Sequence, residues 1–331
     1  MKSFRLRILV LSVLLLLPLL VHAEWLHEEA AIMGTAINVE LWNEDPSTGR
    51  ALIHAVMDEM RRIDDLMSTY KADSELSRVN AGASKAPVKV SSELFRLIGE
   101  ALKYSDITQG AFDITYASAG QYYDYRKGIK PDDEQLAELL PEINYHHVRL
   151  DAEHTTVQFL QSGVRIDLGG IAKGYAVDRG IAILQAAGIE NALVSAGGDT
   201  RVIGRHWDHQ WMIGIRNPRD HDGIVTRIPL ENAAISTSGD YERYFEKDGI
   251  RYHHILNPAT GKSPHEVHSS SIIGNRATDT DALSTSVFVM GVEKGLALID
   301  SLPDTEAIII DNRGRMHYSN GLARVVPQVA N

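Results

Sequence analysis

The order of helical and extended patterns restricts the fold of this chain more than any other feature of its sequence. Apolar residues recur at helical spacing over 50–67, and further helices are predicted over 92–104 and 133–140. Beyond residue 150 the chain carries short β-prone runs, bounded mostly by Gly, Pro, Asn or Asp, at 156–160, 164–167, 192–196, 211–215, 233–237, 252–256, 270–273 and 307–310. Only two predicted helices interrupt them, over 173–187 with Gly188 as its stop and from about 281 to 299. Strands that follow one another in this way favour an α+β fold with a largely antiparallel sheet over a doubly wound parallel one.

The first 23 residues have the layout of a secretory signal peptide. Lys2, Arg5 and Arg7 precede an apolar run over 8–21, and small residues stand at the cleavage positions of Val21-His-Ala23. The run is shorter than the roughly 20 residues that a membrane-spanning helix needs. We therefore expect residues 1–23 to be removed and residues 24–331 to form one exported domain, in the periplasm or at the outer face of the inner membrane. An uncleaved signal anchor is the alternative.

Composition excludes several kinds of site and partner. The chain has no cysteine, which rules out disulfides, thiolate metal sites, thiol nucleophiles and lipid attachment to an N-terminal Cys. Its net charge of -11 argues against a nucleic-acid partner.

The segment Asp167-Leu-Gly-Gly-Ile-Ala-Lys-Gly-Tyr-Ala-Val-Asp178 joins a predicted strand to a predicted helix. Its glycines would let the backbone approach a ligand closely, and the helix N-terminus that begins near Lys173 offers free N–H groups to a phosphate. The segment lacks the G-x-G-x-x-G pattern of dinucleotide-binding folds. Two interpretations stay open at this point: a phosphate or nucleotide contact, and a tight strand-to-helix turn.

Asp281 and Thr285 lie four residues apart at the start of the last long predicted helix, so they share one face of it. A carboxylate and a hydroxyl there would form half of a Mg²⁺ site, because this hard cation prefers oxygen ligands. The alternative is an ordinary helix start, in which the acidic residue complements the macrodipole. Asp279 is predicted to point away from this face and to cap the helix.

Two adjacent histidines, His253 and His254, occupy opposite faces of a predicted strand that runs into the Asn257-Pro258 turn. A histidine near phosphates can act as a general base, although most histidines are structural. Asp113, which follows Phe112, and the carboxylate of Gly197-Gly-Asp199 are by default turn residues.

Taken in order, these segments resemble the ApbE family of flavin transferases over essentially the whole chain after residue 23. No single motif is specific, but eight of them follow one another at plausible spacings. They are Met33-Gly-Thr35, Met67-Ser-Thr-Tyr-Lys71 with Ser74-Glu-Leu-Ser-Arg-Val-Asn80, Gly110-Ala-Phe-Asp113, Asp167 to Asp178, Gly197-Gly-Asp199, Thr237-Ser-Gly-Asp-Tyr241, His254-Ile-Leu-Asn-Pro-Ala-Thr-Gly261 and Asp281-Ala-Leu-Ser-Thr285.

The resemblance implies a two-lobed, T-fold-like α+β architecture with FAD in a cleft between the lobes. It implies that FAD is contacted near Met33, Tyr70, Ala111, Phe112, Asp113, Asp167, Lys173, His254 and Ile255. It also implies that Mg²⁺ is held by the side chains of Asp281 and Thr285 and by the backbone carbonyl of Gly170. The reaction would be transfer of FMN from FAD to a Ser or Thr hydroxyl of another protein with release of AMP, with His254 as candidate base and Asp281 as catalytic metal ligand.

The acceptor implied by the resemblance is a flavoprotein subunit, for example of a membrane NADH:quinone reductase or an Rnf-type complex. Many relatives are tethered to the membrane through an N-terminal Cys, which this chain lacks, so how it associates with a membrane stays open. Two rival functions are an FAD pyrophosphatase, in which water replaces the acceptor, and a non-catalytic flavin-binding protein of the periplasm. Tyr70 favours transfer over hydrolysis, and the Asp281/Thr285 pair with Lys173 argues against a pure binder.

Overall fold

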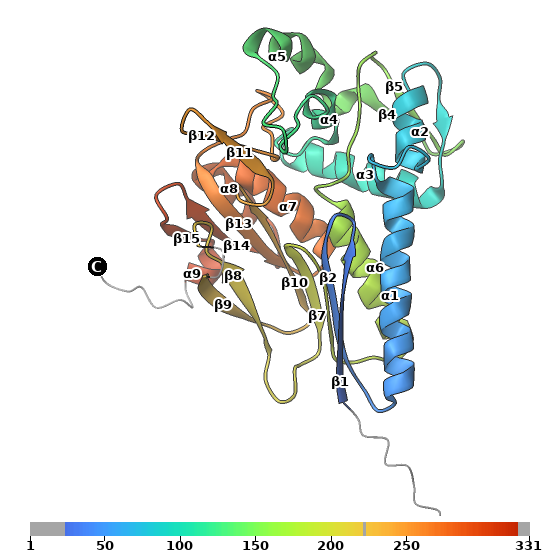
Figure 1. Cartoon of the computed structure of the whole chain (residues 1–331), viewed down its shortest axis with the longest axis vertical. Coiled ribbons are helices and arrows are strands. Elements are labelled where there is room, and N and C mark those ends of the chain that lie inside the picture. The colour runs from blue at the N-terminus through green and yellow to red at the C-terminus, as the bar shows by residue number, and fades with distance from the viewer. Residues whose placement is uncertain (1–23, 221–222, 324–331) are drawn as a thin grey trace, which may run out of the picture.

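An eight-stranded antiparallel sheet forms the centre of the molecule (Figure 1). A computed structural model describes residues 24–220 and 223–323 of the chain. All neighbouring strands pair antiparallel. In sheet order the strands are β1 (Glu24–Ile32), β2 (Thr35–Asn43), β6 (Ala192–Ala196), β7 (Asp199–Ile203), β10 (Ala233–Gly239), β13 (Val267–Gly274), β14 (Glu306–Asp311) and β15 (Met316–Tyr318). The predicted α+β class with a largely antiparallel sheet is thus confirmed.

One face of this sheet is covered by helices. These are α1 (Pro46–Met67), α6 (Ala172–Ala186), α7 (Ala277–Met290) and α8 (Val292–Asp300). The apolar stripe of α1 includes Ile53, Met60 and Ile63, which are fully buried, and burial of each such side chain stabilises the fold by about 1.5–3 kcal/mol. The opposite face packs against the hairpin of β8 (Trp211–Arg216) and β9 (Ile224–Leu230) and the short α9 (Asn320–Ala323).

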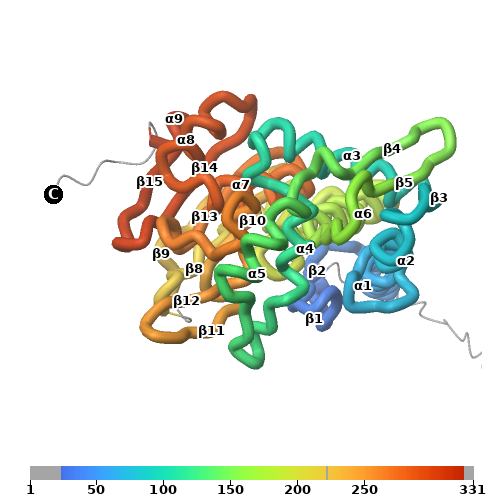
Figure 2. Tube along the Cα trace, turned by 90° about the horizontal axis from the view of Figure 1, so that it is seen from above, coloured from blue at the N-terminus to red at the C-terminus, as the bar shows by residue number. Residues whose placement is uncertain are grey.

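A smaller lobe lies beyond one end of the sheet, above α6 and α7 (Figure 2). It contains α2 (Glu75–Gly82), α3 (Ser92–Ile107), α4 (Ala117–Gly120), α5 (Asp133–Leu139) and a three-stranded sheet of β3 (Val88–Lys89), β5 (Thr156–Phe159) and β4 (Val148–Asp151). Short 3-10 turns span 114–116, 140–142 and 145–147, and the hairpin of β11 (Tyr244–Lys247) and β12 (Ile250–His253) lies nearby. The ion pair of Arg276 with Glu100, 2.7 Å, ties α3 to the start of α7.

Most predicted helices and strands are present, but four details of the prediction were wrong. The strand predicted over 252–256 is β12, which ends at His253, so His254 lies beyond it and not on its opposite face. Residues 164–167 form no strand, because their backbone is bonded by the side chain of Asn80, which contacts both the N–H and the carbonyl of Ile166. The helix predicted from 281 to 299 begins earlier and is broken into α7 and α8 by Gly291, whose φ of 82° suits only glycine. Arg276, and not Asp279, stands at the N-cap of α7.

The segment predicted to be a signal peptide, residues 1–23, lies outside the described residues. Among the helices that are described, none combines the length and the apolar character needed to cross a membrane.

Candidate active site

Two turns and the last residues of β10 come together at one end of the large sheet. The Met33-Gly34 turn joins β1 to β2, and Met33 takes a left-handed φ of 55° there. The Gly197-Gly198 turn joins β6 to β7, and the N–H of Gly197 donates to the carbonyl of Ala36 at 2.9 Å. Gly198 in turn accepts a hydrogen bond from the N–H of Thr237 on β10, at 3.0 Å. The motifs that contain these turns, which lie far apart in the sequence, are therefore neighbours in space.

A buried charge cluster lies beside these turns. Lys173, in the first turn of α6, forms ion pairs with Asp199 at the start of β7 and with Asp281 on α7, the latter at 3.4 Å. Both carboxylates are almost wholly buried, with side chains 2% and 3% exposed. Burial alone would lower the pKa of Lys173, but the charges of the two aspartates outweigh it and raise that pKa. Burial and the charge of Asp199 raise the pKa of Asp281 to about 7.

The same cluster has the composition of half a cation site. One ammonium faces two buried carboxylates, which leaves a net negative charge, and Asp281 also accepts the N–H of Gly174 at 2.9 Å. Thr285 lies one turn beyond Asp281, and a Cβ placed on Gly170 would be 3.4 Å from its Oγ1, so Gly170 and Thr285 are neighbours. Within 24–220 and 223–323, no group of three or more His, Asp or Glu side chains could hold a metal. One carboxylate, one hydroxyl and a nearby backbone carbonyl fit Mg²⁺, which retains several waters or substrate oxygens.

Asp178, the last residue of the 167–178 motif, fixes the start of α7 against α6. Its carboxylate accepts the backbone N–H groups of Ala277 and Thr278 at 3.0 and 2.9 Å, the hydroxyl of Thr278 at 2.6 Å, and a guanidinium N–H of Arg201 at 2.7 Å. The first free N–H groups of α7 are thereby satisfied by a side chain of another helix. Sequence analysis assigned Asp178 no role, and only its place in the motif drew attention to it.

Asp167 links the smaller lobe to the site. Its carboxylate accepts hydrogen bonds from the hydroxyls of Thr69 at 2.8 Å and Tyr116 at 3.1 Å, and from the N–H of Gly169 at 2.7 Å. Burial and the charge of Asp167 raise the pKa of Tyr116, so that hydroxyl stays protonated and donates. Sequence analysis did not predict the contacts of Thr69 and Tyr116 with Asp167, although Thr69 belongs to the motif Met67-Ser-Thr-Tyr-Lys71.

Phe112 and Asp113 have different surroundings although they are adjacent. The ring of Phe112 lies near Gly170, since a Cβ placed there would be 3.1 Å from Cε2, and so it approaches the Asp281/Thr285 region from the smaller lobe. The carboxylate of Asp113 faces its own lobe, where it accepts the N–H and hydroxyl of Thr115 and the N–H of Tyr145. Ala111 is partly exposed next to this turn. Asp113 thus shapes the turn, while Phe112 reaches the site.

His254 follows β12 at the edge of the cluster. Burial, followed by the charge of Arg243, lowers the pKa of His254 to about 3, and Lys173 contributes in the same direction. Its Nδ1 is buried without a hydrogen-bond partner among the described residues. The ring is therefore neutral, and in the free protein its lowered pKa disfavours protonation. Ile255, the next residue, is buried in the apolar cluster that includes Leu283 of α7.

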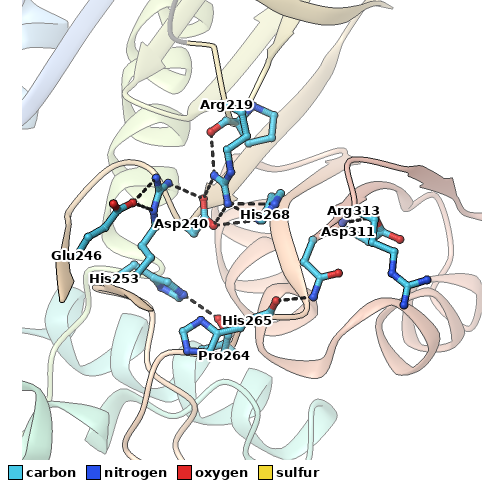
Figure 3. A network of polar contacts seen from close by, with 12 residues as sticks. Arg219, Asp240, Glu246, His253, Pro264, His265, His268, Asp311 and Arg313 are labelled. Carbon is cyan, nitrogen blue, oxygen red and sulfur yellow. Dashed lines mark hydrogen bonds and ion pairs between the residues drawn. The ribbon is translucent and has the colours of Figure 1, made fainter. Parts of the chain in front are cut away.

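A polar network holds the segment that carries His253 and His254 in place (Figure 3). Asp240, from the Thr237 to Tyr241 motif, binds Arg219 through two contacts of 2.8 and 2.6 Å and His268 at 3.1 Å. It also pairs with Arg251 of β12 at 3.5 Å, and His253 contacts the carbonyl of Pro264 at 2.8 Å. The aspartate of this motif thus positions neighbouring strands.

Tyr70 is the most exposed of the predicted site residues. Its side chain is 87% exposed, in the turn after α1, and it lies near enough to Tyr116 to contribute to the raised pKa of that residue. A large aromatic ring held in solvent is available to stack on a planar ligand.

The fold and the cluster define an α+β protein whose candidate site combines a helix N-terminus, a buried lysine and oxygen ligands for a divalent cation, a combination suited to phosphoryl chemistry. A family model described as "ApbE family" matches residues 33–309, and the chain belongs to this family. Curated relatives include the FAD:protein FMN transferase of Treponema pallidum (strain Nichols), 33% identical over 88% of this chain and 86% of that protein. The protein of the same name from Vibrio cholerae is 33% identical over 84% of this chain and 85% of its own length.

Solved structures agree with this assignment. The ApbE protein of Thermotoga maritima matches with a TM-score of 0.84 and 34% identity, over 91% of this chain and 99% of that one. The flavin transferase ApbE of Vibrio cholerae matches with a TM-score of 0.81 and 30% identity, over 91% and 99% of the two chains. The fold expected from the resemblance is therefore confirmed.

Proposed function

We propose that this chain is a Mg²⁺-dependent FAD:protein FMN transferase that attaches FMN to a Ser or Thr of an exported flavoprotein. The observation that carries the proposal is the convergence of Lys173, Asp281 and Thr285 beside Gly170, in a chain whose relatives carry that name. Each of these side chains suits a pyrophosphate that is to be cleaved.

In this proposal the acceptor hydroxyl attacks the FMN phosphorus of FAD. A new P–O bond forms to the acceptor, the bond to the bridging pyrophosphate oxygen breaks, and AMP leaves with that oxygen. Asp281, Thr285 and the carbonyl of Gly170 would hold Mg²⁺, which when bound neutralises negative charge on the pyrophosphate oxygens. The N-terminal turn of α6, next to Gly169 and Gly170, contributes the positive end of its helix dipole, and Lys173 adds a positive charge. The N–H groups of Ala172 and Gly174 already donate to Leu168 and Asp281.

The proton of the acceptor hydroxyl needs a base, and His254 is the candidate. Its ring is neutral at any pH above about 4, because burial and the charge of Arg243 lower its pKa, so a nitrogen lone pair is available. Such a depressed pKa makes it a weak base in the free protein. The negative pyrophosphate of bound FAD would counteract the positive charges of Arg243 and Lys173 and raise that pKa toward a useful value.

Tyr70 and Phe112 would supply the aromatic surface of the proposed FAD site. Tyr70 is free to stack on the flavin or adenine, and Phe112 lies next to Gly170. The acceptor and the location follow the family resemblance and the N-terminal sequence: a flavoprotein subunit of a membrane electron-transfer complex, outside the cytoplasm.

The test is to incubate the protein with FAD, Mg²⁺ and a candidate acceptor, weigh the acceptor by intact-mass spectrometry and follow AMP. A gain of one FMN that EDTA abolishes supports the proposal. AMP without a gain in acceptor mass would identify an FAD pyrophosphatase instead. FAD binding that is equally tight with and without Mg²⁺, and no AMP, would identify a carrier.

A further inference from the structure

All four tryptophans of the chain gather at the end of the large sheet opposite the candidate site. They are Trp25, Trp42, Trp207 and Trp211. Trp25 and Trp42 are direct cross-strand partners at the start of β1 and the end of β2. The Trp25 ring lies 6.0 Å from that of Trp207 and 5.3 Å from that of Trp211, centroid to centroid. These four residues are called the tryptophan patch below.

The tryptophan patch surrounds an open, mainly apolar cavity of about 550 Å³. It is lined by Trp25, Trp42, Asn191, Arg205, Trp207 and Asp208. Trp211 is buried beneath it and donates its indole N–H to the carbonyl of Ile203 at 3.3 Å, so this residue anchors the patch to the core. Trp207, in contrast, is 63% exposed.

Trp207 occupies a backbone conformation that a bulky side chain rarely adopts. It lies in the tight turn closed by mutual hydrogen bonds between His206 and His209, and its φ is 59°. Glycine or asparagine would adopt this left-handed conformation at lower cost. The indole N–H of Trp25 is also buried without an acceptor among the described residues. A strained backbone and an unpaired buried N–H both cost free energy, and such features concentrate at functional surfaces. This indicates that the exposed indole at position 207 has a function.

The charged groups around the tryptophan patch leave no positive excess, because its arginines are paired and the Asp208 carboxylate in the cavity lining adds a negative charge. Arg205 pairs with Glu231 at 2.9 Å, and Arg50, near the start of β1, pairs with Glu24 at 3.6 Å. The patch therefore has no unpaired excess of positive charge that would attract an anionic surface. Its attraction for a partner must come from the indole rings.

The position of the tryptophan patch in the chain indicates which partner that is. Trp25 follows residue 23 by two positions, and the sequence before it carries the basic residues and the apolar run 8–21 of a membrane-targeting segment. Tryptophan is the residue that concentrates at the boundary between lipid and water, because its ring is apolar and its N–H is polar. We propose that the tryptophan patch docks on the lipid–water interface of a phospholipid bilayer. This inference depends on the alternative in which residues 1–23 are retained as a signal anchor, and not on flavin transfer.

Docking through the tryptophan patch would hold the candidate site away from the lipid. β1 runs from Trp25 to the Met33 turn, eight residues at roughly 3.3 Å each, or about 26 Å. The candidate site would then lie about 26 Å above the bilayer surface and face the aqueous phase. An acceptor domain anchored in the same membrane could reach it there.

The test uses intrinsic fluorescence, since every tryptophan of the chain belongs to the patch. The full chain is reconstituted with vesicles of phosphatidylethanolamine and phosphatidylglycerol, with or without bromine near the headgroup end of the acyl chains. We expect emission to fall at least twofold on the brominated vesicles, with no loss of binding when salt is raised. Trp207→Asn is expected to reduce the quenching of the remaining indoles while its Tm stays the same or rises, because asparagine suits the left-handed turn.

Leu160→Asn is the matched control, because Leu160 is 58% exposed in the smaller lobe, and its quenching should equal that of the unchanged chain. Equal emission on brominated and plain vesicles, failure of the full chain to bind vesicles, or unchanged quenching in Trp207→Asn would each overturn the proposal. Indoles that stay open to aqueous acrylamide on bound chains would do so too and would indicate a water-soluble partner. Transfer of FMN to a soluble acceptor should be unaffected in Trp207→Asn, so the two proposals fail independently.

Discussion

Two buried carboxylates that share one lysine are the most unusual feature at the residue scale. Asp199 and Asp281 would repel one another without Lys173, and burying an unbalanced charge is costly. A divalent cation on Asp281 would remove that imbalance. The charge cluster is therefore better suited to the ligand-bound protein than to the free one.

This leads to a first prediction, for Asp281→Asn. The amide can still accept the N–H of Gly174, so we expect the fold to persist while Mg²⁺-dependent AMP release falls at least 100-fold, because the carboxylate ligand is gone. Circular dichroism and AMP release would be measured together. Asp279→Asn is the matched control: it lies two residues earlier on α7 but pairs with Arg276 at 3.0 Å, away from the site, and should retain most activity. Full activity in Asp281→Asn would disprove the metal assignment.

A second prediction concerns His254. His254→Ala should bind FAD with an affinity within about threefold of the unchanged chain, yet transfer FMN at least 10² times more slowly, the usual contribution of a positioned base. Equilibrium binding by flavin fluorescence and single-turnover transfer would separate the two effects. An unchanged transfer rate would remove His254 from the mechanism.

A third prediction follows from His253, whose burial lowers its pKa to about 4. The unfolded chain, with an ordinary histidine pKa near 6.5, binds this proton at a higher pH than the folded chain does. Burial of neutral His253 therefore costs no stability above about pH 6.5. As the pH falls from there toward 4, the free energy of unfolding decreases by up to about 1.4 kcal/mol per pH unit. The free energy of unfolding, measured with urea from pH 4 to 7, should change less steeply with pH in His253→Gln than in the unchanged chain. Parallel slopes would show that His253 is already protonated in the fold.

At the element scale, the geometry of the site depends on how closely α6 and α7 pack. Gly174 has no side chain where α7 begins, and a Cβ there would overlap the carbonyl oxygen of Ala277. Four residues later, Asp178 accepts the N–H groups of Ala277 and Thr278. One face of α6 therefore sets the position of α7, and with it the distance from Lys173 to Asp281.

The fourth prediction tests this packing. Gly174→Ala should destabilise the fold by about 1–3 kcal/mol, because the backbone of α7 must move, and should weaken transfer at least tenfold. Gly99→Ala makes the same change inside α3, where the new methyl would meet only a Leu150 side chain at 3.5 Å. That control should be neutral or stabilise by up to about 1 kcal/mol. Denaturant midpoints and AMP release for both variants would decide, and equal behaviour of the two would refute the packing argument.

The limits of sequence analysis are also clearest at this scale. Periodicity predicted α1 and α3, and Gly188, with a φ of 81°, ends the helix as expected. The same reasoning failed at 164–167, because the bonding of that segment depends on Asn80, 86 positions from Ile166. Local pattern likewise marked Asp281 and Thr285 as half a metal site. It could not reveal that Asp199 and Lys173 lie beside them, since that depends on how β7, α6 and α7 pack.

At the scale of the whole molecule, the candidate site is assembled from both lobes. Lys173, Asp281 and Thr285 belong to the helices on the large sheet, whereas Phe112 reaches Gly170 from the smaller lobe. Asp167 is held by Thr69 and Tyr116, and these bonds connect the segment before α6 to the smaller lobe. A ligand that fills this site should therefore stabilise the molecule as one unit.

The fifth prediction is that FAD and Mg²⁺ together raise the Tm of the chain as a single transition. At a hundred times the dissociation constant, a ligand adds about 2.7 kcal/mol, which for a chain of this size corresponds to roughly 5 °C. EDTA should abolish most of the rise, and Asp281→Asn should not show it. Hydrogen exchange should slow in both lobes, at the Tyr145 N–H that Asp113 accepts and at the Gly174 N–H that Asp281 accepts. Protection confined to the lobe of the large sheet would mean that FAD contacts one lobe alone, and the proposed contacts near Phe112 and Asp113 would then be wrong.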